Sequence, residues 1–273
     1  MTAKFSGEGV ISSRANPLFK SLHKIAHSAR ERRKSGKTLL DGVHLIDAYR
    51  AALGEPEMLI AAPTRLARAE IRAVFSRFGN AKRILMEEAL FDELSPVETP
   101  SGVLALITRR SPEIKKRASA VLLEAIQDPG NLGTLLRSAA AAGFTHALLS
   151  SSCADAWAPK TLRAGMGAHF VLAIDEHVDL LRHLHDASGP VFALSVDGGQ
   201  NLYECDLTGD VALLFGNEGA GLSAELEALA TQRVFIPMAG AVESLNVAAA
   251  ASICCFEKLR QDQRIGLARS RRA

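Results

Sequence analysis

Five polar side chains in this sequence have types and spacing that suit the handling of a phosphorylated sugar. They are one arginine, one carboxylate, two amides and one hydroxyl, namely Arg137, Glu218, Asn131, Asn246 and Ser244. A guanidinium can hold a phosphate through two parallel N–H donors, and amides and hydroxyls can hydrogen-bond to sugar hydroxyls. The set includes no obvious thiol nucleophile and no metal cluster. It therefore favours orienting a substrate beside a reactive cofactor over covalent or hydrolytic chemistry.

Each of these side chains also has a structural explanation. Ser244 or Asn246 could cap the helix that follows by accepting from a free backbone N–H. Asn131 could complete the turn at 128–130, and Arg137 could pair with an acid on the surface. What favours a site is their placement, because the three stretches that carry them each run from an apolar strand into a loop.

The C-terminal part of the sequence alternates apolar strand-like runs with helical stretches. Strands are predicted near residues 121–126, 146–150, 171–174, 191–196, 211–215 and 233–236. This order predicts an α/β fold with a mostly parallel sheet covered on both faces, which binds its ligand at the carboxyl ends of the strands. Alanine-rich helices at 138–142 and 248–251 predict close packing, either against the sheet or against a second subunit.

The N-terminal part predicts a second, smaller α/β domain. Its expected helices are an amphipathic basic helix within residues 11–37, which runs into a turn at Ser35 and Gly36, and helices at 44–53 and 65–78. Its expected strands cover 38–40, 58–62, 83–86 and 103–107. A charged stretch with Pro112 follows and has the composition of a linker. We therefore expect an N-terminal domain at 1–110, a linker at 111–119 and a C-terminal domain at 120–273.

Positive charge is concentrated at the two ends of the chain. The net charge of the 273 residues is only +2, but residues 1–50 hold ten Lys or Arg against four acids. From Lys258 onward there are six Lys or Arg against Asp262 alone. Clustered cations suit a polyanion such as RNA, although a solvated surface explains them equally well.

Several common classes of protein are disfavoured. The four cysteines form no C-x-x-C pair and have no histidines at zinc-finger spacing, so we expect neither disulfides nor a metal site. The sequence shows no export signal and no apolar run of about eighteen residues, which predicts a cytoplasmic protein without a membrane partner. The nucleotide fingerprints G-x-G-x-x-G and G-x-x-x-x-G-K-[ST] are missing, which weakens a nicotinamide-dependent oxidoreductase or a P-loop enzyme.

Taken together, three motifs resemble those of the SpoU/TrmH-type RNA ribose methyltransferases of the SPOUT superfamily. They are N-x-x-x-x-x-R from Asn131 to Arg137, FGNEGAGLS at 215–223 and IPMAGAVESLN at 236–246. The resemblance covers residues 120–260. Upstream, TLLDGVHLIDA at 38–48 and ETPSGVLAL at 98–106 are similar to the substrate-binding domain of the ribosomal-RNA branch, which usually has Glu where Asp41 stands.

The resemblance implies a catalytic domain with a C-terminal trefoil knot, a homodimer, and S-adenosylmethionine as cofactor. Gly216, Ile236 and Leu245 fall where the family contacts the cofactor, and the five polar side chains named above match its active-site residues. The implied reaction is methyl transfer to a ribose 2′-hydroxyl. The family's arginine is usually proposed to help remove the hydroxyl proton. A guanidinium stays protonated, so Arg137 is better suited to binding the adjacent phosphate and stabilising the alkoxide.

Ribosomal RNA is the preferred substrate, and no DNA partner is expected. A tRNA enzyme of the same family is the nearest alternative. An RNA-binding or ribosome assembly factor that kept the fold and lost activity is a second alternative, although the intact motifs argue against it.

Overall fold

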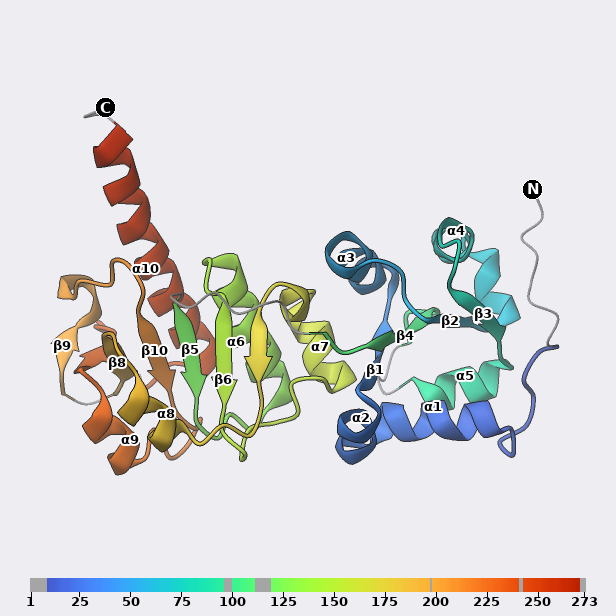
Figure 1. The fold of residues 1–273 in the computed structure, drawn as a ribbon, viewed down its shortest axis with the longest axis horizontal. Helices are drawn as coiled ribbons and strands as arrows, with labels where there is room; N and C mark the ends of the chain where they lie inside the picture. The colour runs from blue at the N-terminus through green and yellow to red at the C-terminus, as the bar shows by residue number, and fades with distance from the viewer. Residues whose placement is uncertain (1–8, 96–99, 111–118, 197, 241–242, 271–273) are drawn as a thin grey trace. The chain divides into compact units, whose positions relative to one another are not determined.

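The computed structural model of the chain describes residues 9–95, 100–110, 119–196, 198–240 and 243–270 (Figure 1). It divides into two compact units, Met1–Arg110 with Trp157–Phe170, and Ser111–Ala156 with Val171–Ala273. Residues 157–170 thus belong to the first unit, although the sequence groups them with the C-terminal domain. The predicted linker at 111–119 lies outside the described residues except for Ser119. The functional division at residues 110–120 stays a prediction.

The first unit contains a four-stranded sheet in the order β1-β4-β2-β3. Its strands are β1 (Lys37–Asp41), β2 (Met58–Ala61), β3 (Lys82–Leu85) and β4 (Leu104–Thr108). Its helices are α1 (Pro17–His27), α2 (Ala29–Ser35), α3 (Val43–Leu53), α4 (Ala69–Arg77), α5 (Glu88–Leu94) and α7 (Pro159–Gly165), with 3-10 turns η1 (Pro63–Ala67) and η2 (Ala168–Phe170). The small α/β domain is confirmed, while α5 was not predicted.

The single helix predicted within residues 11–37 is wrong, because the chain breaks at Ser28, whereas the turn predicted at Ser35 and Gly36 is confirmed by the left-handed Gly36 at the end of α2. The Ser28 hydroxyl accepts from Glu31 N at 3.3 Å and starts α2 in a new direction. The buried Arg32 then reaches back, and its Nη1 donates to Ile25 O and Ala26 O at 2.8 Å each. A charged side chain thus caps α1, which the amphipathic pattern did not reveal.

The segment Trp157–Phe170 joins the first unit through buried contacts. Thr38 Oγ1 on β1 donates to Trp157 O at 2.8 Å, and the Tyr49 and Phe170 rings meet edge to face at 5.3 Å. These contacts link residues more than a hundred positions apart, so local sequence patterns do not reveal them.

The second unit contains a seven-stranded sheet in the order β7-β6-β5-β10-β8-β11-β9, and each of its recorded strand pairs is parallel. The strands are β5 (Ala120–Leu123), β6 (His146–Leu149), β7 (Ala173–Asp175), β8 (Val191–Leu194), β9 (Gln200–Asn201), β10 (Ala212–Phe215) and β11 (Gln232–Phe235). All six predicted strands are confirmed to within a few residues. The two-residue β9 was missed because it is too short to show a pattern.

Helices cover both faces of this sheet (Figure 1). On one face, α8 (Leu180–Asp186) and α9 (Ala224–Leu229) share an apolar cluster with β5, β6, β8 and β10. On the other, α6 (Pro129–Ala141) and α10 (Val247–Ser270) pack together, and Ser138 Oγ lies 2.7 Å from Ser252 Oγ. The alanine-rich stretches therefore pack within the chain. The trefoil knot depends on how the loops after β8, β10 and β11 thread, and it stays a prediction.

Among the residues that the structure describes, none of the helices is both long enough and apolar enough to cross a membrane.

Candidate functional site

Three polar side chains from three separate strand ends meet in one hydrogen-bonded row. Asn131 Nδ2 donates to Glu218 Oε1 at 3.1 Å, and Asn246 Nδ2 donates to Asn131 Oδ1 at 2.9 Å. Asn131 is itself fixed at the start of α6, where its backbone N–H donates to Asp128 Oδ1 at 2.8 Å. Residues that are 87 and 115 positions apart thus form a single cluster.

Asn246 also caps α10. Its Oδ1 accepts from Ala248 N at 2.9 Å and Ala249 N at 3.3 Å, while its Nδ2 is directed to Asn131. The capping explanation and the site explanation of this residue therefore hold together.

Glu218 is surrounded by donors. Besides Asn131, the backbone N–H groups of Gln127 and Asp128 each donate to its carboxylate at 3.3 Å. Burial alone would raise the pKa of Glu218, but hydrogen bonds from its own backbone, from Asn131 and from these two N–H groups together lower it below the ordinary value. The group is therefore an ionised acceptor at neutral pH.

The loop that carries Glu218 is tightly folded. Asn217 Oδ1 accepts from Gly219 N and Ala220 N at 2.9 Å each, and Asn217 and Gly221 exchange a pair of backbone hydrogen bonds. A Cβ on Gly216 would lie 2.3 to 2.4 Å from backbone atoms of Gly221 and Leu222, so only glycine fits there. Asn217 was not singled out from the sequence, although its preference for turns of this kind was a usable signal.

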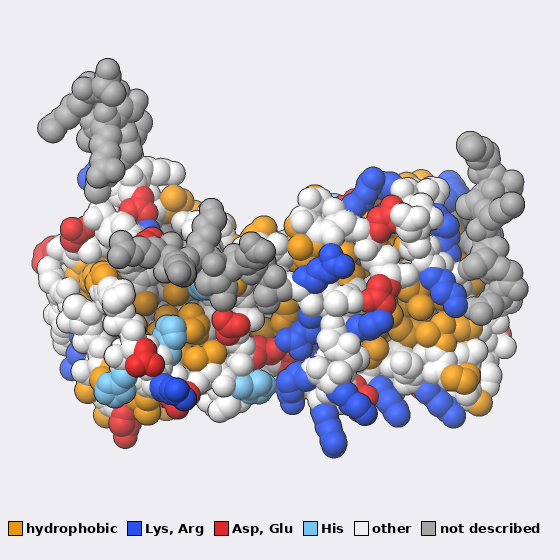
Figure 2. Space-filling model, in the orientation of Figure 1, with side chains coloured by type: hydrophobic (Ala, Val, Ile, Leu, Met, Phe, Trp, Pro, Cys, Tyr) orange, Lys and Arg blue, Asp and Glu red, His pale blue; other side chains and the backbone are white. Residues whose placement is uncertain are grey.

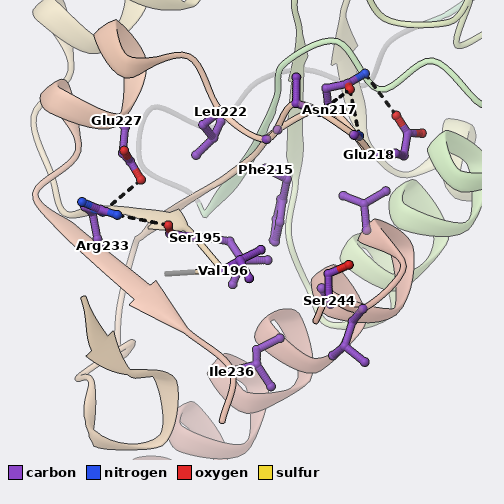
Figure 3. A pocket seen from close by; sticks show the side chains of 18 of the residues that line it. Ser195, Val196, Phe215, Asn217, Glu218, Leu222, Glu227, Arg233, Ile236 and Ser244 are labelled. Carbon is purple, nitrogen blue, oxygen red and sulfur yellow. Dashed lines mark hydrogen bonds and ion pairs between the residues drawn. The ribbon is translucent and has the colours of Figure 1, made fainter. Parts of the chain in front are cut away.

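A cavity of about 450 Å³ opens beside this loop (Figure 3). Gly216, Ile236 and Leu245, the three predicted cofactor residues, all line it, as do Glu218 and Ser244. Asn131 and Asn246 are not among the lining residues; Asn131 is joined to the cavity through its hydrogen bond to Glu218, and Asn246 through its hydrogen bond to Asn131. The volume is typical of a small-molecule site.

The cavity walls suit a nucleoside cofactor that carries a positive charge. Leu194, Val196 and Ala250 add apolar surface for a planar base, and the Glu218 carboxylate adds negative charge where the polar cluster meets the cavity. At the far end, Arg233 Nε lies 2.9 Å from Glu227 Oε1 and its Nη2 donates to Ser195 Oγ at 3.2 Å (Figure 3). Sequence patterns did not single out this ion pair.

Arg137 is not brought into the cluster. It follows Asn131 by six residues on α6, which places the two side chains about 120° apart around the helix axis at roughly 100° per residue. Its side chain is exposed, and within the described residues no hydrogen bond or ion pair holds it. In a single copy of the chain, the predicted arginine lies outside the cavity that Gly216 and Leu245 line.

The cysteines do not supply a nucleophile. Burial raises the pKa of Cys254 to about 12 and also raises the pKa of Cys255, so both remain neutral thiols. No group of three or more His, Cys, Asp or Glu side chains in the described residues is placed to hold a metal ion.

Comparison with known proteins agrees with this geometry. The SpoU rRNA Methylase family matches residues 118–256, and the MRM3-like substrate binding domain matches residues 16–105. The 23S rRNA (guanosine(2553)-2′-O)-methyltransferase RlmP of Bacillus subtilis is 32% identical over 90% of this chain and 97% of its own length.

Two solved structures with AdoMet bound are also similar. The SpoU methyltransferase AviRb from Streptomyces viridochromogenes is 27% identical with a TM-score of 0.79, covering 92% of this chain and 98% of that one. An rRNA methyltransferase from Sinorhizobium meliloti is 27% identical with a TM-score of 0.77, covering 92% and 97%.

Proposed function

This chain belongs to the SpoU rRNA methylase family, and on that premise we propose how its own residues methylate ribosomal RNA. The protein is an S-adenosylmethionine-dependent RNA methyltransferase that acts on a ribose 2′-hydroxyl. The observation that carries the proposal is the hydrogen-bonded row of Asn246, Asn131 and Glu218 at the rim of the cavity.

The cavity holds the cofactor. Gly216, Ile236 and Leu245 contact it, largely through backbone groups and apolar surface. When bound, S-adenosylmethionine supplies an electrophilic methyl group on a positively charged sulfur. The ionised Glu218 stabilises positive charge at this end of the cavity and at the same time fixes the orientation of Asn131.

The polar side chains at the rim position the acceptor ribose. Ser244 is exposed and lines the cavity, so its hydroxyl can hydrogen-bond to the sugar. The Asn131 amide, held from both sides by Glu218 and Asn246, orients the 2′-hydroxyl. Arg137 binds the neighbouring phosphate and stabilises the developing alkoxide, and the proton leaves through that phosphate rather than to the guanidinium.

Arg137 reaches this site only if a second copy of the chain is present, so we place the enzyme as a homodimer. The face of α6 and α10 around Arg137 supports this arrangement. Phe256 on α10 is 48% exposed, and Ala249 lies exposed two turns before it. Exposed apolar side chains on α10, which packs against the helix that carries the exposed Arg137, suit an interface that delivers the arginine to the partner's cavity.

The N-terminal unit recognises the RNA. Lys and Arg side chains gather over α1 and α2 (Figure 2). Five of them are exposed and have no ion pair among the described residues, namely Lys20, Lys24, Arg30, Arg33 and Lys34. A surface of this kind binds phosphates, and we call it the α1–α2 basic surface.

The free thiols are consistent with a reducing cytoplasmic location.

The test is methyl transfer in solution. Purified protein and radiolabelled S-adenosylmethionine are incubated with total RNA from a strain that lacks the gene, and the labelled nucleotide is mapped. We expect label on one ribose of ribosomal RNA and none with the Asn131→Ala variant. Label confined to tRNA would move the substrate to the tRNA branch, and cofactor binding without any transfer would favour an assembly factor.

A further inference from the structure

A second cavity, of about 340 Å³, lies at the carboxyl ends of β5 and β6, beside the first one. Glu124, Ser150 and His177 contribute polar groups to it, and Val178, Leu181 and Leu226 contribute apolar surface. Resting on the function proposed above, we propose that this cavity receives the base of the target nucleotide and that Glu124 reads it as guanine.

The two cavities share a wall. Leu222 lines the cofactor cavity and the next residue, Ser223, lines the second one. Ser223 N donates to Glu124 Oε2 at 2.7 Å, which ties the two loops together. A nucleotide whose ribose lies at the cofactor cavity therefore has its base within reach of the second cavity.

The short turn at residues 124–128, which follows β5, also joins Glu124 to the Glu218 carboxylate. Glu124 is followed within four residues by Gln127 and Asp128, whose backbone N–H groups donate to Glu218. One carboxylate thus faces each end of the turn. An occupant that fills both cavities would contact both carboxylates, as a ribose with its attached base does.

The turn is held rigidly in place. Ala125 has a φ of 54°, a left-handed conformation that a side chain rarely adopts. It is held by Ser150 Oγ, which accepts from Ala125 N at 3.0 Å, and by Asn217 Nδ2, which donates to Ala125 O at 2.8 Å. The direction of the Glu124 side chain is therefore set by the loop that also builds the cofactor cavity.

The chemistry of Glu124 matches guanine better than the other bases. Its Oε2 accepts from Ser223, and within the described residues its Oε1 has no partner. A carboxylate only accepts hydrogen bonds, and the Watson–Crick edge of guanine presents two adjacent donors, N1–H and the N2 amino group. The apolar side chains of the cavity supply the contact that a base taken out of its stack requires.

The test couples a protein change to a base change. Glu124→Gln keeps an oxygen for Ser223 N and replaces one acceptor with a donor. Inosine at the mapped target position removes only the N2 amino group. We expect either change alone to lower kcat/KM about 10- to 100-fold, as the loss of a bidentate contact does, and the two together to lower it little further.

Wild type and Glu124→Gln, each with guanosine or inosine at the target position, are also compared in equilibrium RNA binding. This measurement is made with S-adenosylhomocysteine and needs no turnover. Glu225→Gln is the matched control, because this exposed carboxylate on α9 lines neither cavity. Cofactor affinity and Tm should be unchanged in both variants.

If the losses from Glu124→Gln and from inosine multiply in kcat/KM and in binding, the inference is wrong while the methyltransferase activity stands. A target that maps to a nucleotide other than guanosine would have the same consequence. A wild-type protein that transfers no methyl group contradicts the proposed function and, because the inference rests on that function, the inference with it.

Discussion

Asn246 shows how one side chain can serve the fold and the site together. Its oxygen caps the first turn of α10, and its nitrogen donates to Asn131. Since one amide supplies both an acceptor and a donor, aspartate, which only accepts when ionised, cannot replace it, and serine would have to make both contacts through a single, shorter-reaching oxygen. Capping alone would have allowed all three residue types.

Two substitutions separate these roles. Asn246→Asp keeps an acceptor for the cap and loses the donor, so we expect near-normal stability and a loss of methyl transfer. Asn246→Ala loses both, and we expect a further decrease of about 1 kcal/mol in the free energy of unfolding. Denaturant unfolding and single-turnover assays measure the two effects. Equal stability of the two variants would contradict the capping role.

The lowered pKa of Glu218 has a direct consequence for stability. Its ionised form is favoured in the folded state, so its contribution is present above the ordinary pKa of 4.5 and is lost as the pH falls through the lowered value. We expect Glu218→Gln to be less stable than the wild type at pH 7 and the difference to shrink below about pH 4.5. Thermal unfolding over pH 3 to 8 gives the comparison. A difference that grows on acidification would contradict this assignment.

At the scale of elements, the loop 216–222 is built by close backbone approach. Gly216 leaves no room for a Cβ against Gly221 and Leu222, whereas a Cβ on Gly219 would meet its nearest atom, Asn217 Oδ1, at 3.6 Å. The two glycines therefore have different roles, although they stand three residues apart in the same motif.

We expect Gly216→Ala to open this loop and weaken cofactor binding at least tenfold, since the cavity wall must move by more than a side chain can absorb. Gly219→Ala is the matched control and should bind the cofactor as the wild type does. Isothermal titration with S-adenosylmethionine measures both variants. Normal binding by Gly216→Ala would show that the loop tolerates a shift of its backbone.

At the scale of the whole molecule, RNA affinity is expected to depend on the α1–α2 basic surface. A variant in which Arg30, Arg33 and Lys34 are all replaced by Gln should have a shallower dependence of RNA affinity on salt. The slope of the logarithm of the binding constant against the logarithm of salt concentration should fall by up to about 0.7 to 0.9 per lost phosphate contact. Arg72→Gln, an exposed arginine on α4, is the control and should leave the slope unchanged. Deleting residues 1–110 is a poorer test, because it would strip α7 of its packing partners.

The homodimer makes a second prediction at this scale. Arg137→Ala should bind the cofactor normally and transfer no methyl group, and Asn131→Ala should also be inactive. If Arg137 acts at the partner's cavity, a statistical mixture of the two variants has one complete site in each mixed dimer and should recover about a quarter of the wild-type activity. Absence of recovery from a mixture shown to exchange subunits would contradict action across the interface.

The sequence by itself determined the strands, the loops after them and the kinds of polar group that those loops carry. These depend on local patterns of apolar residues and on turn chemistry, which neighbouring residues establish. The motif groups Asn131 with Arg137, and the sequence analysis did not draw the consequence that the helical period of α6 sets their side chains apart.

Tertiary structure alone decided which groups meet. Asn131, Glu218 and Asn246 come together because parallel strands end at one edge of the sheet, and their hydrogen bonds span 87 and 115 residues. In the same way, Trp157–Phe170 joins the first unit, and Glu124 faces a cavity that sequence patterns did not reveal. Such contacts depend on how distant segments pack, and no local pattern of residues encodes that packing.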